Sequence, residues 1–221
     1  MGKKRNFINS FHNSTKRDYL SRMNKAKPQN IKIAKKYGFG FWDASRETGY
    51  GGYTYQPGRF KNMAKALIKA YKLKSNSKIL DVGCGKGFLL HEMKLLVPGL
   101  KIVGFDISKY AINKATKLIK PSLFFHRAEK KYPFKNKEFD LVISISTLHN
   151  LEIYDLKKAL TEISRVGKKS YVVVESYEND QQLFNLQCWA LTCASFFSSS
   201  SWKWIFKEFN YKGDYEFTFF N

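Results

Sequence analysis

The sequence of 221 residues contains only three cysteines, Cys84, Cys188 and Cys193. They are too few and too scattered for a disulfide framework or a zinc knuckle, so we expect a reducing compartment and no metal site. No apolar run approaches the roughly 18 residues that a membrane span needs. No apolar stretch follows the charged start, as a secretory signal would require. The sequence therefore predicts a cytoplasmic protein without a membrane span.

Acidic residues are also scarce. The chain has 18 Asp and Glu against 39 Lys and Arg, a formal net charge of +21. The imbalance is greatest in residues 1–40, which contain eleven basic residues and one acidic residue. A basic segment suits a nucleic acid, an anionic lipid or an anionic substrate as partner. A bias in coding composition explains the charge equally well, because the chain is also rich in Asn, Ile, Phe and Tyr.

The chain nevertheless has the material for a sizeable core. Hydrophobic residues make up 43% and aromatic residues 16% of the sequence, which excludes global disorder. Residues 1–37 are polar and basic, whereas residues 38–58 place aromatic rings between glycines. From residue 59 onward, apolar residues recur with regular spacing. We therefore expect a basic N-terminal arm (1–37), an aromatic, glycine-rich lid (38–58) and one folded domain (59–221).

Strands and helices alternate through that domain. Short, continuously apolar strands are predicted at residues 78–83, 101–105, 123–126, 139–146 and 170–175. Helices are predicted at residues 59–73, 88–96, 108–119, 156–166, 183–197 and 202–209. This alternation predicts an α/β fold with a mostly parallel sheet and helices on both faces. The tail at residues 215–220 reads as one late strand, which we expect to be antiparallel.

The most informative segment is a glycine-rich turn between the first strand and the next helix. Glycines there let the backbone approach a ligand closely, and the start of the helix offers free N–H groups. Residues 83–87 read Gly-x-Gly-x-Gly, which is neither the dinucleotide fingerprint nor a phosphate loop. Asp106 ends the next strand, where a carboxylate can accept both hydroxyl protons of a ribose. The sequence thus predicts a nucleoside site at this edge of the sheet.

These motifs resemble those of class I S-adenosylmethionine-dependent methyltransferases. The resemblance is carried by residues 79–87 (ILDVGCGKG), 103–108 (VGFDIS), 128–129 (AE), 132–134 (YPF) and 139–144 (FDLVIS). A Gly-Gly-Tyr before the first helix, Thr-Leu-His-Asn-Leu after the fourth strand and a Trp-rich tail are similar to the bacterial type-11-like group. The resemblance implies a Rossmann-like methyltransferase domain over residues 59–221. The family usually ends in a hairpin, whereas this tail has room for one strand.

The resemblance also implies roles for individual residues toward S-adenosylmethionine. The glycines of the turn, with Cys84 between them, would line the methionine and ribose, and Asp81 would order the turn and reach the ammonium through water. Asp106 would hold the ribose, and Ile107 would pack on the adenine. The remaining implied contacts are Ala128 and Glu129 at the adenine edge, Ser144 and Ile145 below the sulfonium, and Gly83, Gly85 and Gly87 in the turn.

Methyl transfer needs an aligned acceptor and, for many acceptors, a base. Candidate bases belong at the carboxyl ends of the fourth and fifth strands, facing the cofactor. His149 is the first candidate because its ordinary pKa suits base work near neutrality. Glu175 and Tyr177, after the fifth strand, are the alternatives. A structural or capping role for His149 remains open.

The aromatic segment 38–58 is expected to fold over the site as a lid that excludes water. Tyr53 is a candidate for binding the cofactor carboxylate or the substrate, and Arg59 for pairing with an acidic group. A packing role for the same rings is an equal alternative.

The sequence leaves three functions open. The first is methyl transfer to an O or N of a small polar or anionic metabolite, such as a sugar or a surface-polysaccharide precursor. The second is an RNA methyltransferase that binds through the basic arm. It is disfavoured because the Pro-Pro-Tyr/Phe signature for base nitrogens and a Pro-Cys nucleophile are absent. The third is a non-catalytic binding module, which the intact glycine turn and Asp106 argue against.

Overall fold

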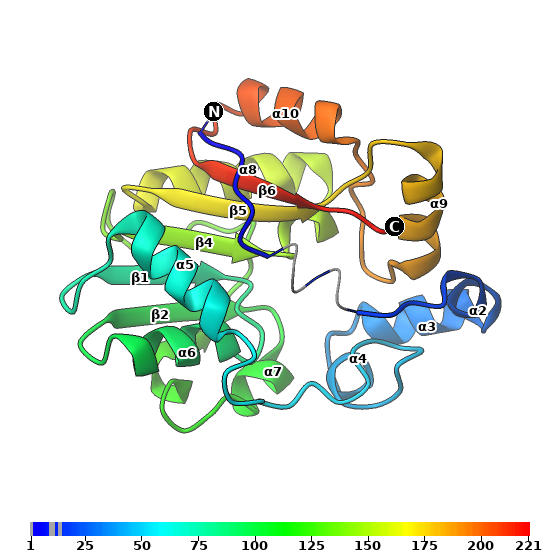
Figure 1. The fold of residues 1–221 in the computed structure, drawn as a ribbon, viewed down its shortest axis with the longest axis horizontal. Helices are drawn as coiled ribbons and strands as arrows, with labels where there is room; N and C mark the ends of the chain where they lie inside the picture. Colours follow the sequence, from blue (N-terminus) through cyan, green and yellow to red (C-terminus); the bar gives the residue numbers. More distant parts are fainter. Residues whose placement is uncertain (1, 9–11, 13–14) are drawn as a thin grey trace.

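The computed structural model describes residues 2–8, 12 and 15–221 (Figure 1). Within these residues lies a six-stranded sheet with the order β3-β2-β1-β4-β5-β6. The strands are β1 (Lys78–Val82), β2 (Lys101–Asp106), β3 (Leu123–Phe125), β4 (Leu141–Ile145), β5 (Ser170–Glu175) and β6 (Asp214–Thr218). The predicted α/β fold with a parallel sheet is confirmed.

The direction of the last strand differs from the prediction. Strand β6 pairs with β5 in parallel register, with Tyr171 opposite Asp214 and Glu175 opposite Thr218, so the expected late antiparallel strand is wrong. The cause lies in helix α10 (Ser199–Glu208), which packs on the sheet between the two strands in chain order. A crossover helix carries the chain back to the edge where β5 began, and a strand that starts there runs parallel to β5.

Helices cover both faces of the sheet (Figure 1). Helices α5 (Lys61–Tyr71), α6 (Phe88–Leu96) and α7 (Lys109–Asn113) pack on one face, and α8 (Ile153–Val166) and α10 pack on the other. Helix α8 shows why: Leu156, Ala159, Leu160 and Ile163 are fully buried and recur every three or four residues. The short 3-10 helices are η1 (Lys120–Ser122) and η2 (Leu148–Asn150).

Four other helices of the described residues lie beyond the carboxyl ends of the strands (Figure 1). They are α2 (Tyr19–Asn24), α3 (Lys27–Ala34), α4 (Phe39–Trp42) and α9 (Asp180–Trp189). Two cationic side chains from the N-terminal segment, Lys27 and Arg22, donate hydrogen bonds to carbonyl groups in the last turn of α9. Lys27 Nζ donates to the carbonyl of Gln187 at 2.6 Å, and Arg22 Nε donates to that of Trp189 at 2.9 Å. Cations at this position complement the helix dipole and fasten α2 and α3 to α9.

The first residues of the chain lie along β6. The N–H of Arg5 donates to the carbonyl of Tyr215 at 2.8 Å, and the Arg5 guanidinium pairs with Asp214 at 2.6 Å. Glu216, which is fully buried, accepts the N–H groups of Phe7 and Ile8 at 2.6 and 2.9 Å. It also accepts the hydroxyl of Tyr171 at 2.6 Å. One buried carboxylate therefore joins β5, β6 and the beginning of the predicted arm.

Replacing Glu216 tests this anchor. The change Glu216→Ala leaves two backbone N–H groups and a tyrosine hydroxyl without their acceptor. We expect the free energy of unfolding to fall by about 2–4 kcal/mol in urea titrations. The exposed Glu208→Ala on α10 serves as control, with an expected change within about 0.5 kcal/mol. Equal stability of both variants would contradict the anchoring role of Glu216.

Candidate active site

A cavity of about 630 Å³ lies at the carboxyl ends of β1, β2, β4 and β5. This volume is typical of sites for small molecules and cofactors. Successive strands are added on one side of β1 up to β3 and on the other side from β4 onward, so the strand order reverses between β1 and β4. Open parallel sheets bind ligands at such a switch point. Of the residues predicted for the site, the lining includes Tyr53, Arg59, Asp81, Gly83, Cys84, Gly85, Asp106, Ile107, Ala128, Glu129, Ile145, His149 and Glu175.

Three predicted site residues lie elsewhere. Ser144 is fully buried on β4, where its hydroxyl donates to the carbonyl of Val82 at 2.9 Å. Gly87 begins α6 at φ 69°, and a side chain there would collide with Ile119. Tyr177 follows β5 and pairs through its backbone with Ser198. These residues hold the sheet and its connections, whereas the cavity is lined by their neighbours.

The glycine turn is shaped for close approach. Gly83 and Gly85 have φ angles of 78° and 55°, which side-chain-bearing residues rarely adopt. A β-carbon on Gly83 would collide with the side chain of Thr147, and one on Gly85 would lie 2.7 Å from the ring of Trp42. The turn therefore leaves backbone, and no side chain, against the cavity at both positions.

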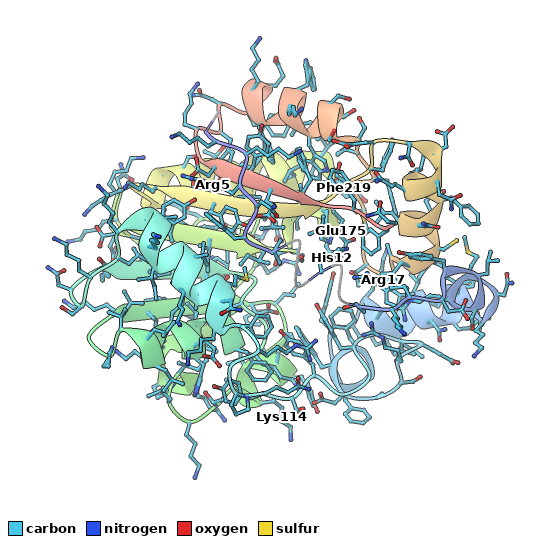
Figure 2. The ribbon with its side chains drawn as sticks, in the orientation of Figure 1. Arg5, His12, Arg17, Lys114, Glu175 and Phe219 are labelled. Carbon is cyan, nitrogen blue, oxygen red and sulfur yellow. The ribbon has the colours of Figure 1, made fainter. Side chains whose placement is uncertain are left out.

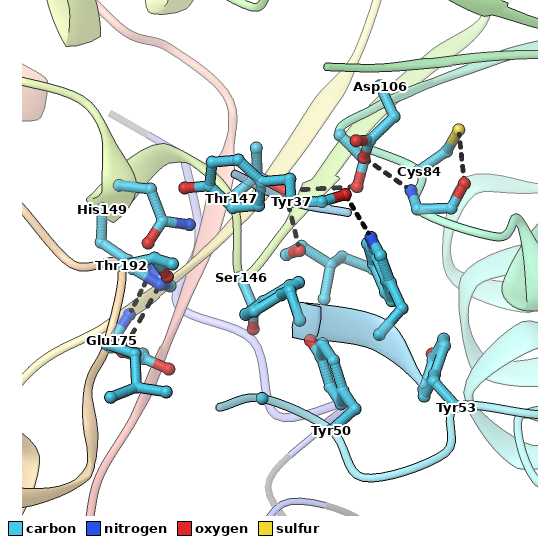
Figure 3. Close-up of a pocket in the computed structure, with 18 of the residues that line it drawn as sticks. Tyr37, Tyr50, Tyr53, Cys84, Asp106, Ser146, Thr147, His149, Glu175 and Thr192 are labelled. Carbon is cyan, nitrogen blue, oxygen red and sulfur yellow. Dashed lines mark hydrogen bonds and ion pairs between the residues drawn. The ribbon is translucent and has the colours of Figure 1, made fainter. Parts of the chain in front are cut away.

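Asp106 holds the turn in place. Its carboxylate accepts the N–H of Gly85 at 2.8 Å and the N–H of Ser108 at 2.7 Å (Figure 3). Burial raises the pKa of Asp106, and these two hydrogen bonds oppose that effect. Each carboxylate oxygen keeps a further lone pair, so Asp106 can also accept hydroxyl protons from a ligand in the cavity.

Asp81 is a second buried acid at this end of the cavity, and its pKa is raised. Burial, followed by the charge of Asp106, raises the pKa of Asp81 to about 8. The same burial and the same two carboxylates raise the pKa of the Cys84 thiol. Two acids that share a buried site favour a ligand that brings positive charge.

The lid segment lies against the turn. Trp42, at the end of α4, donates its indole N–H to the hydroxyl of Ser108 at 2.9 Å and stacks on Tyr50 with a centroid distance of 5.1 Å. Beside it, buried Lys86 of the glycine turn pairs with Asp43 at 2.6 Å and donates to the carbonyl of Tyr53 at 2.6 Å. Although burial opposes it, the hydrogen bond from Lys86 holds the pKa of Asp43 below its usual range. The lid is thus fastened to the turn by a buried ion pair.

His149 and Glu175 form a pair at the ends of β4 and β5. The N–H of Glu175 donates to His149 Nδ1 at 3.1 Å, so the proton of the neutral ring lies on Nε2. That nitrogen faces Glu175 Oε2 at 3.4 Å (Figure 3). Burial lowers the pKa of His149, and Glu175 opposes the shift. Both ring nitrogens are therefore engaged by Glu175.

The cavity also contains residues that the sequence analysis did not select. They include, from the predicted arm and from the segment after α9, Ile8, His12, Thr15, Arg17, Arg22 and Thr192. The charge of Glu175 acts on Arg17, and Figure 2 shows both side chains at the carboxyl end of the sheet. The only sequence signal was the excess of basic residues before residue 40, because this segment lacks a helical or strand period.

Comparison with known proteins agrees with this geometry. A family model described as a methyltransferase domain matches residues 73–210. The chain belongs to this family and is a class I S-adenosylmethionine-dependent methyltransferase, as the motifs predicted. In the residues that the structure describes, no helix is long and apolar enough to cross a membrane, and no cluster of His, Cys, Asp and Glu could hold a metal ion.

Curated relatives match over part of their length. The chain is 32% identical to a mitochondrial arginine-hydroxylase of Mus musculus over 49% of this chain and 31% of that one. It is 28% identical to a ubiquinone biosynthesis O-methyltransferase of Pelagibacter ubique over 55% and 52%. The chain thus spans about a third of the length of the first relative and about half of the length of the second.

A solved structure supports the fold. A protein from Galdieria sulphuraria, described as a putative sarcosine dimethylglycine methyltransferase, superposes with a TM-score of 0.56 at 14% identity. The superposition covers 81% of this chain and 72% of that one.

The described residues match the chemistry of S-adenosylmethionine. Gly83 and Gly85 line the cavity with backbone, and Thr147 and Trp42 pack closely against them. Asp106 can hold ribose hydroxyls, and Asp81 faces the same space as a buried acid that a cationic ligand would complement. Ile107, 36% exposed in the cavity lining, offers an apolar surface for a base.

Removing the Asp106 carboxylate tests the ribose contact. We expect Asp106→Ala to weaken S-adenosylhomocysteine binding by about 1–3 kcal/mol, the range for hydrogen bonds to a charged group. Calorimetric titration measures the affinity. The exposed Asp180→Ala on α9 is the charge-matched control and should bind as the unmodified protein does. Unchanged affinity in Asp106→Ala would exclude the ribose contact.

The raised pKa of Asp81 predicts a pH dependence of binding. Below about pH 8 the free protein holds a proton on Asp81, and the ligand ammonium favours the ionised form. Binding therefore releases a proton, and the affinity for S-adenosylhomocysteine should rise by up to tenfold per pH unit between about pH 6 and pH 8. The Asp81→Asn variant should lose this rise. A flat profile in the unmodified protein would contradict the coupling.

Proposed function

We propose that this methyltransferase acts on an oxygen or nitrogen of a small polar or anionic metabolite. The observation that carries the proposal is that the residues expected to bind the cofactor and the Glu175–His149 pair line one cavity. S-adenosylmethionine, when bound, supplies an electrophilic methyl group that carries its own leaving group. The protein must then align the acceptor for in-line displacement and take up its proton.

Glu175 is the base that the geometry supports. His149 uses its Nδ1 lone pair for the N–H of Glu175, and its Nε2 lies 3.4 Å from Glu175 Oε2. A histidine bonded in this way orients a carboxylate and has no free lone pair for an acceptor. Glu175 lines the cavity and can accept a proton from a hydroxyl or an amine. His149 then serves as a positioning residue.

The predicted arm supports a small acceptor in preference to RNA. Ile8, Thr15 and Arg17 line the same cavity as the glycine turn, and residues 2–8 are bonded along β6. In these positions the segment encloses the site. Arg17 and Arg22, unlike the exposed lysines of the segment, thereby face an acceptor in the cavity.

Methyl transfer from radiolabelled S-adenosylmethionine tests this function. The protein is incubated with a cell extract separated into small-molecule, RNA and protein fractions. We expect label in the small-molecule fraction, in the form of a product that survives nuclease and protease. Label confined to RNA would overturn the proposal in favour of the RNA alternative.

The same assay tests the base. We expect Glu175→Gln to slow labelling by about 10²-fold or more, because the amide cannot accept the proton. Binding of S-adenosylhomocysteine should persist in this variant. Tyr177→Phe, outside the cavity lining, is the control and should label at the normal rate. Full activity in Glu175→Gln would remove Glu175 as the base.

A further inference from the structure

Three arginines surround one indole ring in the cavity. The guanidinium carbons of Arg17, Arg22 and Arg46 lie 5.5, 4.4 and 5.1 Å from the ring centroid of Trp189. All four side chains belong to the cavity lining. Arg17 and Arg22 come from the N-terminal segment, Arg46 from the lid and Trp189 from the end of α9. We call these four residues the arginine cluster.

No carboxylate lies within ion-pair distance of the arginine cluster in the described part of the chain. Glu175 acts on Arg17 at longer range. The hydrogen bonds of the cluster go mainly to carbonyls: Arg17 to those of His12 and Thr15, and Arg46 to that of Tyr50. Arg17 also approaches His12 Nδ1 at 3.4 Å and interacts with Tyr19. Glu47, the acid that acts on Arg22, is itself paired with Lys25 at 3.4 Å. The cavity therefore contains a concentration of positive charge.

One donor of the cluster is buried without an acceptor. Arg17 Nε is enclosed and has no hydrogen-bond partner within the described part of the chain. A buried N–H group without a partner is costly, and native structures rarely leave one. Burial of this donor adds to the cost of burying the Arg17 charge, and an anion against the rest of the guanidinium would offset part of that cost.

The closeness of the three arginine charges also favours an anionic ligand. Burial, and then the charge of Arg46, lowers the pKa of Arg22 to about 10. Burial also lowers the pKa of Arg17; Tyr19 and Glu175 oppose this shift, and the charge of Arg46 adds to it. Arginines that destabilise one another's charged form gain free energy when an anion lies between them.

We propose that Arg17, Arg22 and Arg46 bind a doubly charged oxyanion group of the methyl acceptor. Phosphate esters and paired carboxylates share this chemistry, because planar guanidinium groups donate two parallel N–H bonds to such oxygens. The inference deepens the proposed methyl transfer and rests on it. It makes the acceptor a dianionic metabolite, held by its charged end.

The position of the cluster suits the reaction. Arg17 lies near enough to Glu175 for the two charges to interact, and Figure 2 shows the two side chains at the same end of the sheet. An acceptor whose anion rests on the arginines can therefore present its hydroxyl or amine to Glu175. The acidic residues Asp81 and Asp106 line another part of the same cavity, so an anionic acceptor and a cationic cofactor bind to separate charges.

Titration with simple anions tests the proposal. The probes are phenyl phosphate, phthalate and the singly charged benzoate, measured by calorimetry at fixed low ionic strength. The test variant is Arg17→Gln/Arg46→Gln; Arg22 is left unchanged because it binds the Trp189 carbonyl at the end of α9. The matched control is Lys35→Gln/Lys36→Gln, which removes the same charge from exposed positions of the same segment. S-adenosylhomocysteine binding reports that each variant is folded.

We expect at least one dianion to bind the unmodified protein about tenfold or more tightly than benzoate does. The arginine variant should lose at least tenfold in that affinity, and the lysine control should change less than about twofold. The dianion that binds more tightly identifies the chemistry as phosphate or dicarboxylate. S-adenosylhomocysteine should bind all three proteins equally.

Three results would overturn the inference. They are equal loss in both variants, no binding of either dianion or equal affinity for benzoate and the dianions, or, with a single-stranded RNA oligonucleotide as a fourth probe, tighter binding of the RNA that the arginine variant abolishes. Each can occur while S-adenosylhomocysteine still binds, which leaves the proposed function standing. Failure of S-adenosylhomocysteine to bind the unmodified protein would instead refute the proposed function.

Discussion

The carboxylate of Asp106 is the constraint on which the site depends. Its two hydrogen bonds to the N–H groups of Gly85 and Ser108 fix the glycine turn to the end of β2. Ser108 in turn accepts the indole N–H of Trp42, so the position of the lid follows from the same residue. A change at Asp106 therefore reaches the turn, the start of α7 and the lid together, in addition to any ligand.

Charge is distributed within the cavity in a way that matches the proposed reaction. Asp81 and Asp106 place two buried acids beside the glycine turn, and the arginine cluster places three cations in another part of the lining. Glu175 lies where its charge acts on Arg17. This separation gives a cationic cofactor and an anionic acceptor distinct positions, with a proton acceptor available to the second. Arg17 and Arg22, two of the basic residues of the N-terminal segment, thereby acquire a proposed role.

Local patterns were sufficient for the core of the fold and for the residues that gather around the glycine turn. The first strand, the glycine turn and Asp106 lie within 30 residues of one another. Short windows of sequence therefore contain the whole pattern of apolar strand, glycines and carboxylate. The direction of β6 was beyond such patterns, because it depends on how α10 crosses the sheet. Ser144 was placed below the sulfonium from its position in a motif, yet it points into the sheet toward Val82.

The N-terminal segment shows the same limit more clearly. Glu216 holds Phe7 and Ile8 across more than 200 residues of sequence, and Arg17 and Arg22 contact Trp189 across more than 160 residues. A charged, aperiodic segment carries no local signal for contacts of this kind. The pairing of His149 with Glu175 was likewise invisible, although both were candidates, because it depends on the adjacency of β4 and β5.

The most direct measurement is a crystal structure of the protein with S-adenosylhomocysteine. The account predicts ribose hydroxyls within hydrogen-bond distance of the Asp106 carboxylate, the homocysteine chain along the turn at Gly83 and Gly85, and the base against Ile107. The sulfur should face the part of the cavity that contains Glu175. A nucleoside bound elsewhere, or an Asp106 carboxylate that does not contact the ribose, would contradict the account.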